Sequence, residues 1–86
     1  MKEYLTELDL LIESNIISYS KRIDNNSTNE QFSKVLSDFN SSIAKIGTEI
    51  IHKSIVDGFT NDDITTEVGN RLSGATKRFI ELNNKG

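Results

Sequence analysis

Apolar side chains recur every three or four residues over the first part of the chain, which is the spacing of one face of an α-helix. The series predicts a helix over residues 2–23. Two further apolar residues, Leu10 and Ile17, lie off this face and widen the stripe, so we expect this helix to contact more than one neighbour. The residues of the face are Tyr4, Leu5, Leu8, Leu11, Ile12, Ile16, Tyr19 and Ile23.

A run of short polar residues at positions 24–29 interrupts the pattern. Such side chains compete for backbone hydrogen bonds and favour turns and helix N-termini. Thr28 with Gln31, or Ser27 with Glu30, has the spacing of a capping box, in which two side chains satisfy N–H groups at a helix start. A new helix is therefore predicted to begin here.

This second helix is predicted over residues 29–57 and has an apolar seam with steps of three and four. Beyond the seam the apolar residues are Ile51, Ile55 and Phe59, so the buried stripe is expected to rotate around the helix. Gly47 lies inside the helix, where we interpret it as a point of close approach by a neighbouring helix. The seam consists of Phe32, Leu36, Phe39, Ile43, Ile46 and Ile50.

Local signals predict a third helix over residues 61–83. Gly58 suits the position after a helix end, where the backbone takes a positive φ. Thr60 is the expected N-cap, and Phe59 is expected to pack on Ile64 as a hydrophobic staple. The apolar positions of this helix are Ile64, Val68, Leu72, Ala75, Phe79 and Leu82.

These elements predict an all-α fold, a three-helix antiparallel bundle with a long central helix, in a single domain over residues 1–86. The chain has no proline, and we find no alternating pattern that predicts a strand. A chain of 86 residues builds only a thin core, and the absence of cysteine leaves no disulfide to support it. We therefore expect homodimerisation to complete the bundle.

The charge is mildly acidic overall, at −3, which is unfavourable for general binding to nucleic acid or anionic membranes. It is unevenly distributed, because residues 1–69 sum to −6 and residues 70–86 to +3. No stretch has the apolar length of a signal sequence or a membrane span, so a cytoplasmic protein without membrane contact is expected. Abundant isoleucine, asparagine and lysine are typical of AT-rich coding sequences and predict a bacterial or phage accessory protein.

Candidate chemistry is sparse. His52 is the single histidine, and its one nearby orienting carboxylate on the predicted helix is Glu49, so the pair is interpreted as solvated surface. A zinc site needs several histidine or cysteine ligands, which the chain lacks. Neither a phosphate-binding glycine loop nor a nucleophile motif occurs. We predict no catalytic residues, no metal and no cofactor, and hence that the protein is not an enzyme.

The basic end of the chain supports one alternative, a small dimeric DNA-binding regulator with a helix-turn-helix in residues 60–80. A turn at Gly69 would divide this segment into two short helices. Against this, Asn70 stands where such motifs bury an apolar side chain, and the unbroken apolar period through Leu72 fits one continuous helix. The nucleic-acid contacts would come from Arg71, Thr76, Lys77 and Arg78.

The first hypothesis is a small interaction module that docks an apolar helix face on a protein partner. Inhibitors, antitoxins, immunity factors and assembly adaptors would all act in this way. The partner or dimer interface is predicted on the apolar seams of the first two helices, at Leu8, Ile12, Ile16, Tyr19, Phe39, Ile43, Ile46 and Ile50.

Overall fold

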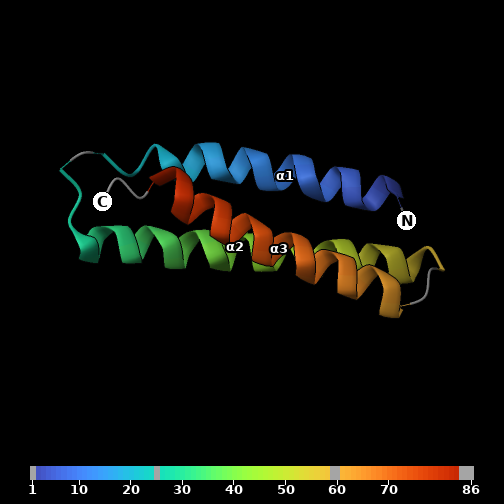
Figure 1. The fold of residues 1–86 in the computed structure, drawn as a ribbon. Coiled ribbons are helices and arrows are strands. Elements are labelled where there is room, and N and C mark those ends of the chain that lie inside the picture. The colour runs from blue at the N-terminus through green and yellow to red at the C-terminus, as the bar shows by residue number, and fades with distance from the viewer. Residues whose placement is uncertain (1, 25, 59–60, 84–86) are drawn as a thin grey trace.

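Three helices account for most of the chain (Figure 1). The computed structural model describes residues 2–24, 26–58 and 61–83, and within these ranges the regular structure is entirely α-helical. The all-α prediction is therefore confirmed. The helices are α1 (Lys2–Ser20), α2 (Asn29–Val56) and α3 (Asn61–Asn83).

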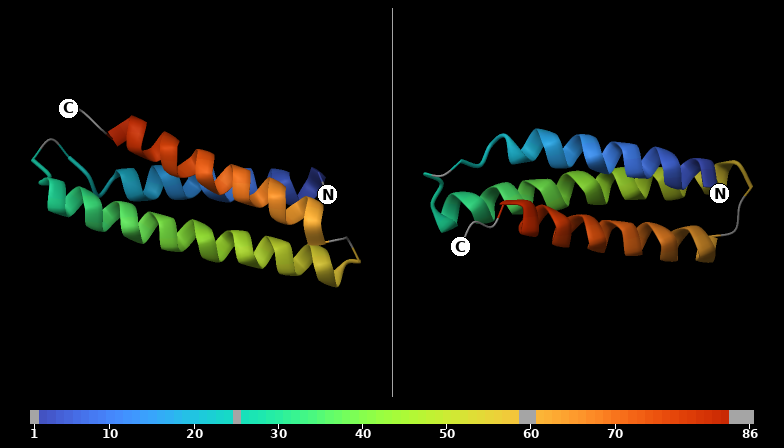
Figure 2. Two further views of the ribbon diagram at one scale, coloured as in Figure 1. Left: turned by 60° about the horizontal axis from the view of Figure 1, so that its bottom comes forward. Right: turned by 45° about the horizontal axis from the view of Figure 1, so that its top comes forward.

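The helices pack side by side in an up-down-up order, so that α2 runs antiparallel to both of the others and α1 and α3 are parallel neighbours (Figure 2). Hydrogen bonds join α2 to each of its two neighbours. Ser42 Oγ donates to Asn15 Oδ1 at 2.6 Å between α2 and α1, and Thr76 Oγ1 donates to Asn40 Oδ1 at 2.7 Å between α3 and α2. The result is an elongated bundle of 48 × 17 × 16 Å around the long central helix.

The start of α2 has the predicted capping box, made by Thr28 and Gln31. The Thr28 hydroxyl accepts a hydrogen bond from the backbone N–H of Gln31 at 3.1 Å, and the Gln31 side chain accepts one from the backbone N–H of Thr28 at 2.8 Å. Two backbone N–H groups that have no partner within the helix are thereby satisfied. Of the two spacings compatible with a capping box, the structure uses this one.

The end of α2 follows the prediction for Gly58. Its φ is +93°, in the region that side chains rarely adopt, and its N–H donates to the carbonyl of Ile55 at 3.0 Å. Asp57 is the C-cap residue. The predicted contact of Phe59 and the predicted N-cap at Thr60 lie outside the described residues.

The helix α1 ends at Ser20 and not at Ile23 as predicted. After Ser20 the backbone bonds tighten: the N–H of Arg22 donates to the Tyr19 carbonyl and that of Ile23 to the Ser20 carbonyl, both at 3.1 Å. The Asp24 carboxylate then accepts from a backbone N–H in the following turn, which competes with further helix. Ile23 still packs against the core, so it continues the apolar pattern although it lies beyond the end of the helix.

The core lies between the three helices and is centred on an aromatic stack. The rings of Phe39 and Phe79 have centroids 4.3 Å apart and an interplanar angle of 10°, and both side chains are fully buried. Tyr19 meets Phe39 edge-on at 6.0 Å. The buried apolar residues around this stack are Leu5, Leu8, Ile12, Ile16, Ile43, Ile50, Ile64, Val68 and Ala75.

The predicted rotation of the α2 stripe after Ile50 is confirmed at Ile51, which is partly buried and packs against the core, and is wrong at Ile55; Phe59 lies outside the described residues. The buried side of the helix continues to Ser54, which is fully buried, whereas Ile55 is exposed. The Ser54 hydroxyl donates to the Ile51 carbonyl at 2.7 Å, which satisfies it inside the core. Hydropathy alone assigned the buried role to isoleucine, because a serine that bonds its own helix is not visible in an apolar pattern.

Gly47 is a point of close helix approach, as predicted. It is buried, and a Cβ atom at this position would lie 2.8 Å from Leu72 Cδ1 and 3.0 Å from Val68 Cγ1. Both of these atoms belong to α3. The absence of a side chain at Gly47 therefore sets how closely α2 and α3 pack.

The N-terminal end of α1 is joined to the C-terminal end of α2 by polar contacts. The Tyr4 hydroxyl donates a hydrogen bond to Asp57 Oδ2, and Lys53 Nζ forms an ion pair with Glu7 Oε2 at 3.2 Å. The bond to the Asp57 carboxylate favours the protonated phenol and raises the pKa of Tyr4 to about 12. These contacts align α1 along α2, since each joins residues distant in sequence.

The helix α3 is continuous from Asn61 to Asn83 and passes through Gly69 without a turn. The helix-turn-helix alternative required a turn there, so this segment does not have the two-helix form. Val68 and Leu72 precede and follow Gly69 in the sequence, and both face α2 at Gly47. Their contacts with α2 favour one continuous helix through Gly69. Gly69 is exposed, with no atom within 4 Å of a Cβ built on it.

We expect Gly69→Ala to raise the free energy of unfolding by about 0.5–1 kcal/mol, because alanine fixes an exposed helical backbone at a lower entropic cost than glycine. Urea unfolding followed by far-ultraviolet circular dichroism measures the change. Gly58→Ala is the matched control and should lower the free energy of unfolding, because its φ is positive. A loss of stability in Gly69→Ala similar to that in Gly58→Ala would show that Gly69 is not helical.

Candidate functional site

The eight residues predicted to form a partner or dimer interface lie in the core of the single chain. Six of them are buried, and the other two, Tyr19 and Ile46, are partly buried against that core. In this fold they contact the other helices of the same molecule, and only Tyr19 and Ile46 among the eight retain partly exposed side chains. The six buried residues are Leu8, Ile12, Ile16, Phe39, Ile43 and Ile50.

The four residues of the nucleic-acid alternative are not gathered into a basic patch. Arg71 Nε donates to Asp9 Oδ1 at 3.0 Å, and Arg71 Nη1 to Glu67 Oε2 at 2.7 Å. Arg78 donates through both of its terminal nitrogens to the carboxylate of Glu13. Acidic residues thus neutralise both arginines.

The other two candidates of that alternative lie apart from each other. The Thr76 hydroxyl donates to Asn40 and is partly buried between α3 and α2. Lys77 is exposed and makes no hydrogen bond or ion pair with the described residues. Within the described part of the basic end, Arg71 and Arg78 are paired with carboxylates and Lys77 lies apart from them.

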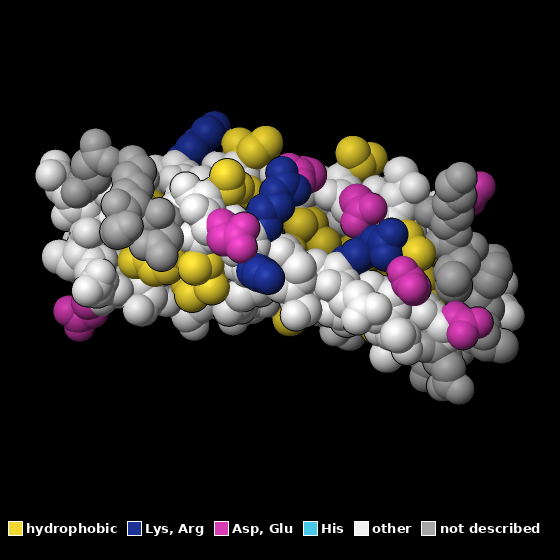
Figure 3. Space-filling model, in the orientation of Figure 1, with side chains coloured by type: hydrophobic (Ala, Val, Ile, Leu, Met, Phe, Trp, Pro, Cys, Tyr) yellow, Lys and Arg dark blue, Asp and Glu magenta, His cyan; other side chains and the backbone are white. Residues whose placement is uncertain are grey.

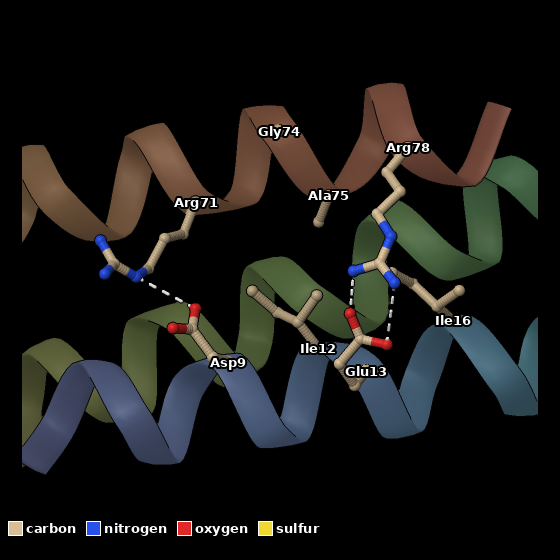
Figure 4. Close-up of a pocket in the computed structure, with 8 residues that line it drawn as sticks. All are labelled: Asp9, Ile12, Glu13, Ile16, Arg71, Gly74, Ala75 and Arg78. Carbon is tan, nitrogen blue, oxygen red and sulfur yellow. Dashed lines mark hydrogen bonds and ion pairs between the residues drawn. The ribbon is translucent and has the colours of Figure 1, made fainter. Parts of the chain in front are cut away.

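A shallow groove runs between α1 and α3 (Figure 4). The Arg71–Asp9 and Arg78–Glu13 ion pairs cross it. It has a volume of about 360 Å³ and is open to solvent. Ile12, Ile16 and Ala75 line its floor, and Arg71 and Arg78 reach across it to carboxylates on α1. Charged groups that already satisfy each other leave few polar atoms for a ligand, so we assign the groove a role in joining the two parallel helices.

The described residues contain no group of three or more histidine, cysteine or carboxylate side chains that could hold a metal ion. His52 is exposed on α2, and it has no hydrogen-bond or ion-pair partner within the described part of the chain. Across those same residues, no helix is both long and apolar enough to cross a membrane.

The surface feature that stands out is a set of exposed apolar side chains on α1. Leu10 is 67% exposed and Ile17 is 57% exposed, and their spacing of seven residues places them on the same side of the helix. We call this side, with Ser14 between the two, the α1 outer face. Figure 3 shows apolar side chains projecting from the upper edge of the molecule, where α1 lies.

One apolar residue of α3 extends this surface. Leu82 is 57% exposed and lies one turn beyond Arg78, while Ile17 lies one turn beyond Glu13. Leu82 and Ile17 lie between two contacts that join α1 and α3. These are the Arg78–Glu13 ion pair and the hydrogen bond from Asn83 Nδ2 to Ser20 Oγ at 3.0 Å. Because α1 and α3 are parallel, Leu82 and Ile17 occupy the same level of the bundle.

In the sequence, Leu10 and Ile17 widen the apolar stripe of the first helix, whereas the interface was predicted on the stripe itself. The signal that separates the two groups is that Leu10 and Ile17 are the apolar residues farthest from the main face. Leu82 carried no such signal, because it continues the regular period of its own helix.

Comparison with protein-family models, curated proteins and solved structures finds no match to this chain.

Proposed function

We propose that this protein is a small non-enzymatic interaction module that docks the α1 outer face on a protein partner, in the manner of an inhibitor, antitoxin, immunity factor or assembly adaptor. The observation that carries the proposal is the exposure of Leu10 and Ile17 on one side of a helix whose other side is buried. A helix that is covered on one side and has two exposed apolar side chains on the other is suited to a partner that supplies a complementary apolar surface.

The energetic argument uses the exposed fractions. Complete burial of a leucine or isoleucine side chain contributes about 1.5–3 kcal/mol. More than half of this contribution remains available at Leu10 and at Ile17, and a similar share remains at Leu82. A partner that covers the three side chains therefore gains about 3–5 kcal/mol from them, enough to change an affinity by about two to four orders of magnitude.

The polar surroundings support a protein partner. The Glu13–Arg78 ion pair lies between the levels of Leu10 and Ile17, where it can exchange partners with groups of a bound protein at the rim of an interface. Apolar residues ringed by charged groups are typical of interaction sites on small proteins.

The test is a comparison of three tagged baits in nuclease-treated lysate of the native source. The baits are the unchanged protein, the double variant Leu10→Glu/Ile17→Glu, and the control variant Val56→Glu. Val56 is 70% exposed on α2, so this control adds a glutamate at an apolar position outside the α1 outer face, with one new charge where the double variant has two. Circular dichroism should show an intact fold in all three.

We expect a stoichiometric protein partner on the unchanged protein and on Val56→Glu, and its loss from the double variant. Retention of every captured protein by the double variant would contradict the proposal. If nuclease is omitted and the unchanged protein captures nucleic acid in place of protein, loss of that capture in Lys77→Ala would favour the DNA-binding alternative.

A further inference from the structure

We propose that the α1 outer face binds a second copy of this chain in the antiparallel direction, so that the protein is a two-fold symmetric dimer joined through α1. This inference rests on the proposed function, because it names the partner of the same face. It differs from the dimer expected from the sequence, whose interface would have used residues that the structure places in the core.

The charge distribution along the bundle determines the direction. The Asn15–Ser42 bond marks the middle of the long axis, since Ser42 is at the centre of α2. On one side, nine acidic and four basic residues give a net −5, and the remaining described residues give a net +1. The acidic half consists of residues 2–16, 43–58 and 61–73.

Two copies lying side by side in the same direction would bring two strongly acidic halves together, which is unfavourable. In the antiparallel direction each acidic half faces the half with the opposite net charge. The residues of α1 follow the same division, because Glu3 is exposed in its first turn and Lys21 is exposed just after its last residue. Complementary charge selects the direction, and the apolar contact provides affinity.

The positions of the apolar residues suit a two-fold axis. The midpoint between Leu10 and Ile17, between Glu13 and Ser14, is close to the level of the Asn15–Ser42 bond at the middle of the bundle. An axis through this point places Leu10 of one subunit opposite Ile17 of the partner subunit, and the reverse, as an isologous interface requires. Ser14 lies next to the axis and is exposed, and its small side chain allows the two helices to approach closely.

The dimensions of the bundle allow an extended contact. Its long side measures 48 × 17 Å, which is the largest face that one copy can offer to the other. The axis lies near the middle of the long side, so an antiparallel pair overlaps along almost its whole length. A shifted or crossed pair would cover less of the apolar face.

The first experiment measures the molar mass of the purified protein by sedimentation equilibrium over about 1 μM to 1 mM. We expect a concentration-dependent dimer for the unchanged protein and for Val56→Glu. Leu10→Glu/Ile17→Glu should raise the dissociation constant by more than about tenfold and give a folded monomer at most concentrations. A protein that remains monomeric throughout the range, or a double variant that dimerises like the unchanged protein, overturns the inference.

The second experiment tests direction and uses the absence of native cysteine. Ser14→Cys lies near the axis and should form an intermolecular disulfide with itself under mild oxidation. Glu3→Cys should not, because the two copies of this position would be roughly 30 Å apart along the antiparallel helices. A mixture of Glu3→Cys with Lys21→Cys should form the mixed disulfide. Efficient pairing of Glu3→Cys with itself would show a parallel dimer and overturn the proposed arrangement.

The outcomes separate this inference from the proposed function. A monomeric pure protein whose capture of a lysate protein depends on Leu10 and Ile17 would refute the second copy and leave the interaction module intact. A monomer that captures no protein through this face would refute both. A dimer that is lost in Leu10→Glu/Ile17→Glu supports the second copy as the partner of this face, and the protein captured from lysate through Leu10 and Ile17 should then be the native copy of this chain.

Discussion

Phe79→Ala is expected to lower the free energy of unfolding by about 3–5 kcal/mol, the range for large aromatic residues truncated in a core. Phe79 is fully buried, and its ring stacks on Phe39 at 4.3 Å while Phe32 lies against it at 6.5 Å. The alanine variant would leave a cavity between all three helices. A domain of this size has a total stability of only about 4–13 kcal/mol, so a large part of it should be lost.

Urea unfolding at a fixed protein concentration measures this loss, and the fixed concentration keeps any self-association constant. Phe32→Ala is the control, because Phe32 is only partly buried and should cost less. The double variant Phe39→Ala/Phe79→Ala should show a coupling of about 0.5–1.5 kcal/mol from the stacked rings. Equal losses in Phe32→Ala and Phe79→Ala would contradict the central position of this stack.

Gly47→Leu should destabilise the protein by about 1–3 kcal/mol through overpacking. Even the Cβ atom of this side chain would come within 2.8 Å of Leu72 Cδ1 and 3.0 Å of Val68 Cγ1, so α2 and α3 must move apart. Gly47→Ala should have a smaller effect, because its gain in helix propensity of up to about 1 kcal/mol offsets the close contact. Unfolding in urea gives both values.

The matched test of this geometry is rescue by Leu72→Ala. Removing the Leu72 side chain creates space beside Gly47, so Leu72→Ala should cost less stability in the Gly47→Leu background than in the unchanged protein. We expect a coupling of at least about 0.5 kcal/mol. Additive effects of the two changes would show that the side chain at position 47 does not point at Leu72.

Much of the local structure was predictable because it depends on interactions within a few residues. Thr28 and Gln31 form their capping box, and Gly58 takes its positive φ. The end of α1 was not predictable to the residue, because the apolar pattern continues to Ile23 although the helix ends at Ser20. The Ile23 side chain packs against the core, whereas hydrogen bonds between nearby residues end the helical backbone.

The candidate site was less predictable than the helices. Leu10 and Ile17 were recognised as apolar residues off the main face, but nothing in a periodic pattern says which face of α1 its neighbours cover. The arginines of the basic C-terminal segment gave a misleading signal. Arg71 and Arg78 are far in sequence from Asp9 and Glu13, and only the parallel packing of α1 and α3 pairs them.

Three α-helices, the capping box of α2, the positive φ of Gly58 and the residues that share each apolar face could be predicted from the chain alone. These follow from backbone hydrogen bonding and from the 3.6-residue period, which act over one or two turns. The burial of Ser54, the exposure of Ile55, the pairing of the arginines of α3 and the uncovered outer side of α1 depend on the packing of the three helices. Burial and ion pairing depend on how closely three helices approach one another, and this distance is set by contacts such as that of Gly47 with Leu72, between residues far apart in the chain.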